Sequence, residues 1–190
     1  MSEIFVFGGS NGSGKSTIAT KFLSSIDPSL EFVNADIIAA QLNPDDVDAV
    51  AITASRIMLD RLKDLAKRKI DFAFETTLAA RSFARFLREC KNNGYIINLT
   101  YVWLESPELA ISRVAKRVAS GGHDIPRDTI ARRYQRGRKN FLNLYSPLAD
   151  SWIIYNNSES SIQIVAEKTI DGSSKIYQPI VWQQINSQSL

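Results

Sequence analysis

The sequence contains few of the residues that cross-link small domains or bind soft metal ions, with one cysteine and one histidine among 190 residues. A lone cysteine excludes an intramolecular disulfide. The spacing of Cys90 from Phe83, Phe86 and Leu87 places it on a helical apolar stripe, so we expect a core residue. His123 has glycine and aspartate as neighbours and no second His or Cys nearby, so a zinc site is not expected. A contact to phosphate and an exposed loop position both stay open for His123.

The chain also lacks an apolar run of the ~18 residues that indicate a membrane-spanning helix. No basic stretch precedes an apolar segment at the N-terminus, and no internal repeat or low-complexity tract is present. We therefore expect a cytoplasmic protein without membrane contact. A length of 190 residues, with 44% hydrophobic and 23% charged residues, predicts one domain over residues 1–190 with a substantial core.

A glycine-rich segment follows the first apolar run, Ile4 to Phe7, and fills every position of the template G-x-x-x-x-G-K-[ST]. Glycine lets successive backbone N–H groups turn toward phosphate oxygens, in conformations that a Cβ would obstruct. Lys15 is expected to reach the β- and γ-phosphates, and Ser16 to offer its hydroxyl to Mg²⁺. The sequence therefore predicts a P-loop that binds a nucleoside triphosphate and Mg²⁺. Its residues are Gly9, Ser10, Asn11, Gly12, Ser13, Gly14, Lys15, Ser16 and Thr17.

The rest of the chain alternates between short apolar runs and helical patterns, which is typical of a mostly parallel sheet with helices on both faces. We predict an α/β fold of the P-loop NTPase class, with a doubly wound, five-stranded sheet and a C-terminal edge extension over residues 161–190. The predicted strands are 3–7, 31–34, 70–75, 96–104 and 152–155, and the predicted helices are 15–24, 45–69, 80–92, 107–119 and 126–144.

In such a sheet the ligand site lies beyond the carboxyl ends of the strands. Asp36 follows the second predicted strand and is our candidate general base, with an N-cap for the next turn as the alternative. Glu75 ends the third predicted strand, where it could bind Mg²⁺ through water, hold an acceptor hydroxyl, or cap a helix. Thr77 could donate to the substrate or cap the next helix. Asn157 and its neighbours follow the last strand and give a weak indication of the adenine side of the site.

Positive charge is concentrated in residues 113–139, which contain nine basic and two acidic residues. The rest of the chain has 14 basic and 18 acidic residues. This stretch contains two predicted helices around Gly121 and Gly122, which is typical of a kinase lid with a hinge. Guanidinium groups over the triphosphate would neutralise charge in the transition state. Arg113 and Arg117 are four residues apart and share one helix face, as do Arg132 and Arg136. A solvated basic face is the alternative interpretation.

These segments together resemble the zeta toxin-like kinases, of the short form often described as a predicted ABC-type ATPase. The resemblance covers most of residues 4–158. It is carried by the P-loop and by the segments Asn34-Ala35-Asp36, Glu75-Thr76-Thr77-Leu78, Arg113-Val114-Ala115-Lys116-Arg117-Val118, Arg132-Arg133-Tyr134 and Asn140-Phe141.

The resemblance implies a kinase that phosphorylates a hydroxyl of UDP-N-acetylglucosamine with ATP and Mg²⁺, with an antitoxin protein as partner. It implies Asp36 as the base, Glu75 and Thr77 on the acceptor, and arginines of the Arg117 and Arg132 type on the γ-phosphate. The family's Glu-Gly-Thr-x-Arg reads Glu-Thr-Thr-Leu-Ala here, so the arginine is missing at position 79. Arg81, two residues later, is the candidate substitute.

Two other functions remain open from the sequence. The P-loop segment also suits a transporter-type ATPase or an ATP-gated partner protein, although no L-S-G-G-Q-like segment is present. The basic stretch, with Tyr134, Phe141 and Tyr145 interleaved, could serve a polynucleotide. Those aromatics have helix-core spacing, so a nucleic-acid partner is not expected.

Overall fold

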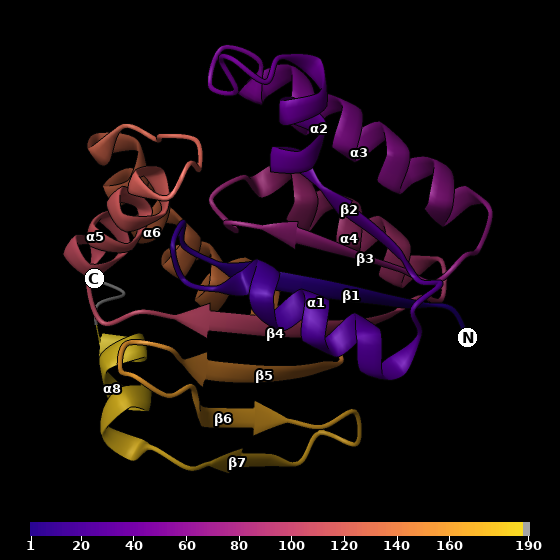
Figure 1. Cartoon of the computed structure of the whole chain (residues 1–190). Coiled ribbons are helices and arrows are strands. Elements are labelled where there is room, and N and C mark those ends of the chain that lie inside the picture. Colours follow the sequence, from indigo (N-terminus) through magenta and orange to yellow (C-terminus); the bar gives the residue numbers. More distant parts are fainter. Residues whose placement is uncertain (188–190) are drawn as a thin grey trace.

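The structure is a computed structural model that describes residues 1–187, and its centre is one seven-stranded sheet (Figure 1). The strand order is β2-β3-β1-β4-β5-β6-β7. The first five strands are parallel, as predicted, and the last two run antiparallel to their neighbours. The strands are β1 (Glu3–Gly9), β2 (Glu31–Asn34), β3 (Phe72–Thr76), β4 (Ile96–Trp103), β5 (Ser151–Asn156), β6 (Gln163–Lys168) and β7 (Ser174–Ile176).

The two antiparallel strands are the main difference from the predicted sheet. Residues 161–190 were expected at the sheet edge, and β6 does pair with β5 there, but the tail adds strands as well as covering the edge. Helix α8 (Pro179–Ser187) then folds back, and Trp182 stacks on Trp152 with ring centroids 5.7 Å apart. The predicted five parallel strands are thus confirmed within a seven-stranded sheet.

The helices match the predicted alternation except after β2, in the lid and in the C-terminal tail, where α8 was not predicted. A helix forms directly after β2, where only a turn was expected, and the predicted helix over 45–69 begins later, at Ala51. The predicted helix over 126–144 is α-helical to Asn140 and then widens into a π-helical turn. The helices are α1 (Lys15–Ile26), α2 (Ala35–Leu42), α3 (Ala51–Lys67), α4 (Arg81–Asn92), α5 (Pro107–Ala119), α6 (Arg127–Asn140), η1 (Phe141–Tyr145), α7 (Ser146–Leu148) and α8.

Apolar side chains bury both faces of the central strands. The larger core lies where α3, α4, η1 and α8 cover the sheet, and Phe72 and Phe74 are fully buried in it. On the opposite face α1 packs Phe22 against Phe7 of β1. Cys90 is buried in the larger core, as predicted, and burial raises the pKa of its thiol to about 11.

Helices α5 and α6 form a hairpin beyond the carboxyl ends of the parallel strands (Figure 1). The hairpin has a small core of its own, in which Val114, Ile125 and Ile130 are buried. The Tyr134 hydroxyl donates a hydrogen bond of 2.6 Å to the backbone oxygen of Leu104, and this bond ties α6 to the end of β4. The basic stretch is therefore held over the strand ends as one unit. Over residues 1–187, no helix combines the length and apolar character needed to cross a membrane.

Candidate active site

The P-loop joins β1 to α1 and keeps its polar groups directed inward. Gly14 is the N-cap of α1, with a φ of 91° that a side chain would strain, and no side chain caps the first turn of this helix. The Ser10 hydroxyl, the Asn11 side-chain oxygen and the Ser13 hydroxyl are buried and have no hydrogen-bond partner among the described residues. A helix N-terminus with free N–H groups and unpaired buried polar atoms fits a bound phosphate chain.

Neighbouring elements hold this loop in place. The Asn157 side-chain NH₂ donates a hydrogen bond of 2.8 Å to the Ser13 backbone oxygen, and a Cβ on Gly14 would come within 2.7 Å of the same nitrogen. On the other side the loop touches α5, where a Cβ on Gly12 would lie 2.8 Å from the Ala110 backbone oxygen. In this structure Asn157 therefore supports the P-loop, a contact that the sequence did not indicate.

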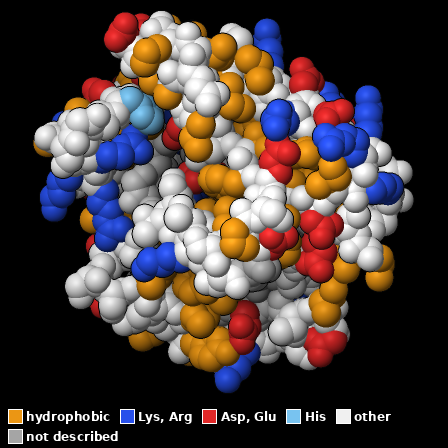
Figure 2. All heavy atoms as spheres, turned by 45° about the vertical axis from the view of Figure 1, so that its right-hand side comes forward, with side chains coloured by type: hydrophobic (Ala, Val, Ile, Leu, Met, Phe, Trp, Pro, Cys, Tyr) orange, Lys and Arg blue, Asp and Glu red, His pale blue; other side chains and the backbone are white. Residues whose placement is uncertain are grey.

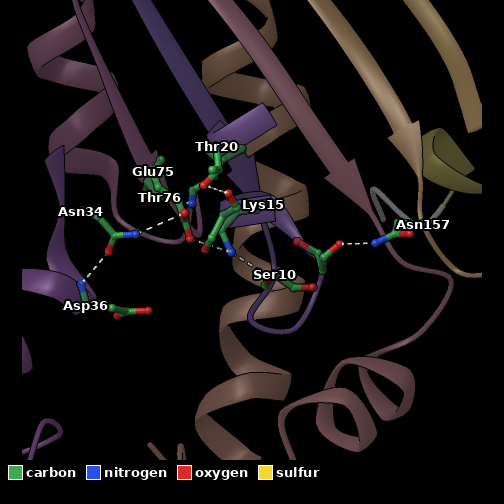
Figure 3. A network of polar contacts seen from close by, with 11 residues as sticks. Ser10, Lys15, Thr20, Asn34, Asp36, Glu75, Thr76 and Asn157 are labelled. Carbon is green, nitrogen blue, oxygen red and sulfur yellow. Dashed lines mark hydrogen bonds and ion pairs between the residues drawn. The ribbon is translucent and has the colours of Figure 1, made fainter. Parts of the chain in front are cut away.

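A buried polar network connects the P-loop to the ends of β2 and β3 (Figure 3). The Lys15 ammonium donates to the Ser10 backbone oxygen at 2.9 Å and lies 3.7 Å from a Glu75 carboxylate oxygen. The Asn34 side-chain NH₂ donates to the other Glu75 oxygen at 3.2 Å. The Lys15 and Glu75 side chains are only 7% and 8% exposed. Each of these buried charges is thus matched by the other and by hydrogen bonds.

Asp36 lies in the first turn of α2, next to this network (Figure 3). Its backbone N–H donates a hydrogen bond of 2.7 Å to the Asn34 side-chain oxygen, which makes Asn34 the N-cap of α2. The alternative interpretation of Asp36 as an N-cap is therefore wrong. Because Asn34 caps the helix, the Asp36 carboxylate is not committed to that role.

A cavity of about 210 Å³ lies between the P-loop, β3, the α2–α3 segment and the lid hairpin. Figure 2 shows the hollowed face, with the single histidine (pale blue) and a group of Lys and Arg side chains (blue) on one side of it. The structure brings five of the predicted site residues to this cavity, together with a histidine and an arginine of the lid. The seven are Asn11, Lys15, Asp36, Glu75, Thr77, His123 and Arg133.

Other predicted site residues lie outside the cavity lining. Arg117 and Arg132 are exposed, and each makes one hydrogen bond of 3.3 Å within the hairpin, to the His123 backbone oxygen and the Thr129 hydroxyl respectively. Arg81 is exposed at the start of α4. Ser16 and Thr17 are exposed in the first turn of α1, on the P-loop side. The sequence favoured Arg132, whereas its neighbour Arg133 lines the cavity.

The segment after β3 carries Thr77 and is held from several sides. Leu78 has a φ of 59°, its side chain is fully buried, and its backbone N–H donates to the Thr76 hydroxyl at 3.1 Å. From α6, the Asn140 side-chain NH₂ donates to the backbone oxygens of Leu78 at 2.8 Å and Ala79 at 3.1 Å. We call residues 76–80 the acceptor loop. The next helix has Ala80 as its N-cap, without a side-chain bond, so the alternative of Thr77 as a helix cap is wrong.

Helix α6 also approaches the acceptor loop at its backbone. A Cβ on Gly137 would lie 2.2 Å from the Thr77 backbone oxygen, so glycine is needed for this contact. Arg138, the next residue, is 7% exposed, although it belongs to the basic stretch. Lid and acceptor loop are therefore packed together, and part of the positive charge is internal.

Comparison with known proteins places this arrangement in a family. The sequence profile of the family "Zeta toxin" matches residues 3–169. The chain belongs to the zeta toxin family of P-loop kinases. Members of this family are ATP-dependent kinases. A protein of Haemophilus influenzae described as uncharacterized is 33% identical over 126 residues, which are 66% of this chain and 88% of that protein.

Solved structures share the fold of this zeta toxin family member. An AvrRxo1-ORF1:AvrRxo1-ORF2 structure with sulphate ions matches the whole chain at a TM-score of 0.80 and 16% identity, and one with ATP matches it at 0.78 and 17%. The chain spans 65% of the length of both. A structure from the PezAT toxin–antitoxin system of Streptococcus pneumoniae matches 96% of this chain and 77% of that one, at 0.61 and 16% identity. These likenesses establish the α/β P-loop kinase fold.

Proposed function

We propose that this protein is an ATP-dependent kinase that transfers the γ-phosphoryl group of ATP to a hydroxyl of a small molecule. The observation that carries the proposal is the shared cavity, which joins the P-loop lysine to a carboxylate of α2 and to the acceptor loop. An ATPase that only hydrolyses ATP needs no such space for an acceptor beside the P-loop. The cavity is where an acceptor would meet the γ-phosphate.

The P-loop supplies the ATP site. Its inward polar groups and the uncapped start of α1 fit a triphosphate, and a solved relative of the same fold was described with ATP. When ATP binds, Lys15 would exchange its contact with Glu75 for the β- and γ-phosphates. The exchange would leave Glu75, still held by Asn34, free to accept a hydrogen bond from the acceptor.

Ser16 would hold Mg²⁺ beside the phosphates, because its hydroxyl is a hard oxygen ligand in the first turn of α1. Bound Mg²⁺ would neutralise charge on the β- and γ-phosphate oxygens. Among the lid arginines, Arg133 lines the cavity as it stands. Arg117 and Arg132 would reach the phosphates only after the hairpin moves about the glycines of its 120–126 loop.

In the transfer step, the acceptor oxygen forms a bond to the γ-phosphorus while the bond from that phosphorus to the β,γ-bridging oxygen breaks. The bridging electron pair leaves with ADP, and the Asp36 carboxylate takes the proton of the acceptor hydroxyl. Glu75 and the Thr77 hydroxyl would orient the acceptor. A positioned general base contributes about 10²–10⁴-fold to such a rate.

The test is ADP release by the purified protein with ATP and Mg²⁺ over a panel of sugars, nucleosides and nucleotides. UDP-N-acetylglucosamine belongs in the panel because the family resemblance implies it. Asp36→Asn should lower acceptor-dependent turnover by about 10²–10⁴-fold. The matched control is Asp45→Asn, an exposed carboxylate that does not line the cavity. Turnover that no acceptor changes would contradict the kinase and favour an ATPase.

A protein partner that inhibits the kinase is part of the same proposal, because the PezAT structure is described as a toxin–antitoxin system. Its most direct test is retention of the native complex when the chain is purified from its own host.

A further inference from the structure

The two sides of the acceptor cavity differ in charge. Lys15 and Arg133 are the Lys or Arg residues that line it among the described residues, and they come from the P-loop and the lid. The opposite side is formed by α2, α3 and the segment between them (Figure 1), and it contributes Asp36, Asp48 and Ser55. The charged residues on the side that faces an incoming acceptor are therefore both acidic.

Both cationic groups come from the P-loop and lid sides of the cavity. Lys15 is hydrogen-bonded to the P-loop backbone at 2.9 Å, in the position from which it reaches ATP phosphates. Arg133 projects from the lid helix together with His123 of the same hairpin. Arg81 and Arg56, the nearby arginines of α4 and α3, are exposed and do not line the cavity. In the part of the chain that the structure describes, no Lys or Arg of α2, α3 or the segment between them lines the cavity.

The size and lining of the cavity point to a small ligand. Its 210 Å³ lies below the ~300–1,000 Å³ of pockets that enclose drug-sized ligands. The γ-phosphate must take part of this space. Ala39, Val47, Met58 and Phe83 supply apolar surface beside the polar groups, which suits a ring with one apolar face and hydroxyls at its edge.

We propose that the acceptor is a polyhydroxylated small molecule without phosphate groups, of monosaccharide or nucleoside size. This inference rests on the proposed function and narrows it. One acceptor hydroxyl gives its proton to Asp36 and its oxygen bonds to the γ-phosphorus, as ADP leaves. A second hydroxyl, or an amine, donates to Asp48. A diphosphate-linked sugar would bring its negative charges against Asp48, on a side of the cavity that no Lys or Arg among the described residues lines.

The experiment compares matched acceptors that differ by their phosphate. The pairs are N-acetylglucosamine with UDP-N-acetylglucosamine, glucosamine with glucosamine 6-phosphate, and adenosine with AMP. Product formation is followed with radiolabelled γ-phosphate, so that transfer and hydrolysis are counted separately. In each pair that is phosphorylated, the member without phosphate should have the higher kcat/KM, by about tenfold or more, because juxtaposed like charges are costly.

Asp48→Asn tests the acidic side of the cavity itself, with Asp45→Asn as the control. Removing the Asp48 charge should shrink the preference for the unphosphorylated member by several-fold, as expected when a repulsive element is lost, and the control should leave it unchanged. A merely structural role of Asp48 would lower both rates equally and leave the ratio as it was, which would overturn the assignment of Asp48. A higher kcat/KM for the phosphorylated members would overturn the acceptor class and leave the kinase standing. Hydrolysis of ATP without transfer to any member would overturn the proposed function and this inference with it.

Discussion

The contact between Gly137 and Thr77 makes an unusual prediction for a glycine inside a helix. Replacing a helix-interior glycine by alanine usually stabilises a protein, by about 0.5–1 kcal/mol, because alanine loses less conformational entropy. Here the new Cβ would lie 2.2 Å from the Thr77 backbone oxygen. The clashing atom belongs to the backbone, so the strain cannot be relieved by rotating a side chain. Gly137→Ala must therefore displace α6 or the acceptor loop.

The magnitude follows from two opposing effects. Overpacking of a tight contact costs about 1–3 kcal/mol, which exceeds the gain in helix propensity. A net loss of about 1–2 kcal/mol lowers Tm by about 2–8 °C in a domain of this size. Since the displaced atom belongs to Thr77, the KM for the acceptor should rise while the KM for ATP changes little.

The assay is thermal unfolding followed by circular dichroism, together with steady-state kinetics for both substrates. Gln135→Ala is the control, since Gln135 is an exposed residue of the same helix and its loss should move Tm only slightly. A Gly137→Ala variant with an equal or higher Tm would refute the close approach of α6 to the acceptor loop.

Three further predictions concern other contacts. Asn140→Ala leaves the buried Leu78 carbonyl without its donor and should cost about 1–3 kcal/mol in urea unfolding, with a raised acceptor KM; an unchanged midpoint would contradict it. Cys90 should resist thiol reagents at pH 8 until the protein unfolds, because burial raises its pKa to about 11; rapid labelling of the native protein would speak against this. Burial alone would raise the pKa of Asp150, but its hydrogen bonds, above all from Lys91, outweigh burial and hold it below the usual 3.8. The Asp150 carboxylate therefore stabilises the folded protein at pH values above 3.8, and this stabilisation is lost as the pH falls through the lowered pKa. Asp150→Asn should thus lower the free energy of unfolding by about 1 kcal/mol at pH 7 and by little at pH 2. An equal cost at both pH values would contradict this sign.

Local patterns explain which parts of the site could be predicted. The P-loop is a contiguous motif, and the carboxyl ends of parallel strands share one edge, so the amino-acid sequence was enough to expect Lys15, Asp36, Glu75 and Thr77 together. The structure does bring these four to one cavity. The same reasoning predicted the five parallel strands correctly.

Contacts between distant segments could not be read in this way. Adjacent residues on a helix point about 100° apart, so the pattern could not decide between Arg132 and Arg133 without the exact phase of α6. The bonds from Asn140 to the acceptor loop span 62 and 61 residues of sequence, and nothing in either segment marks them. Asn and Asp side chains both suit an N-cap, so the sequence alone could not decide between Asn34 and Asp36. The backbone geometry makes Asn34 the N-cap of α2.

The most direct test of the account is transfer of labelled γ-phosphate from ATP to an unphosphorylated sugar or nucleoside, measured for the wild type, Asp36→Asn and Asp45→Asn. The account predicts a labelled phosphate ester with the wild type and Asp45→Asn, and about 10²–10⁴-fold less with Asp36→Asn. Labelled inorganic phosphate as the sole product, formed equally by all three proteins, would contradict it.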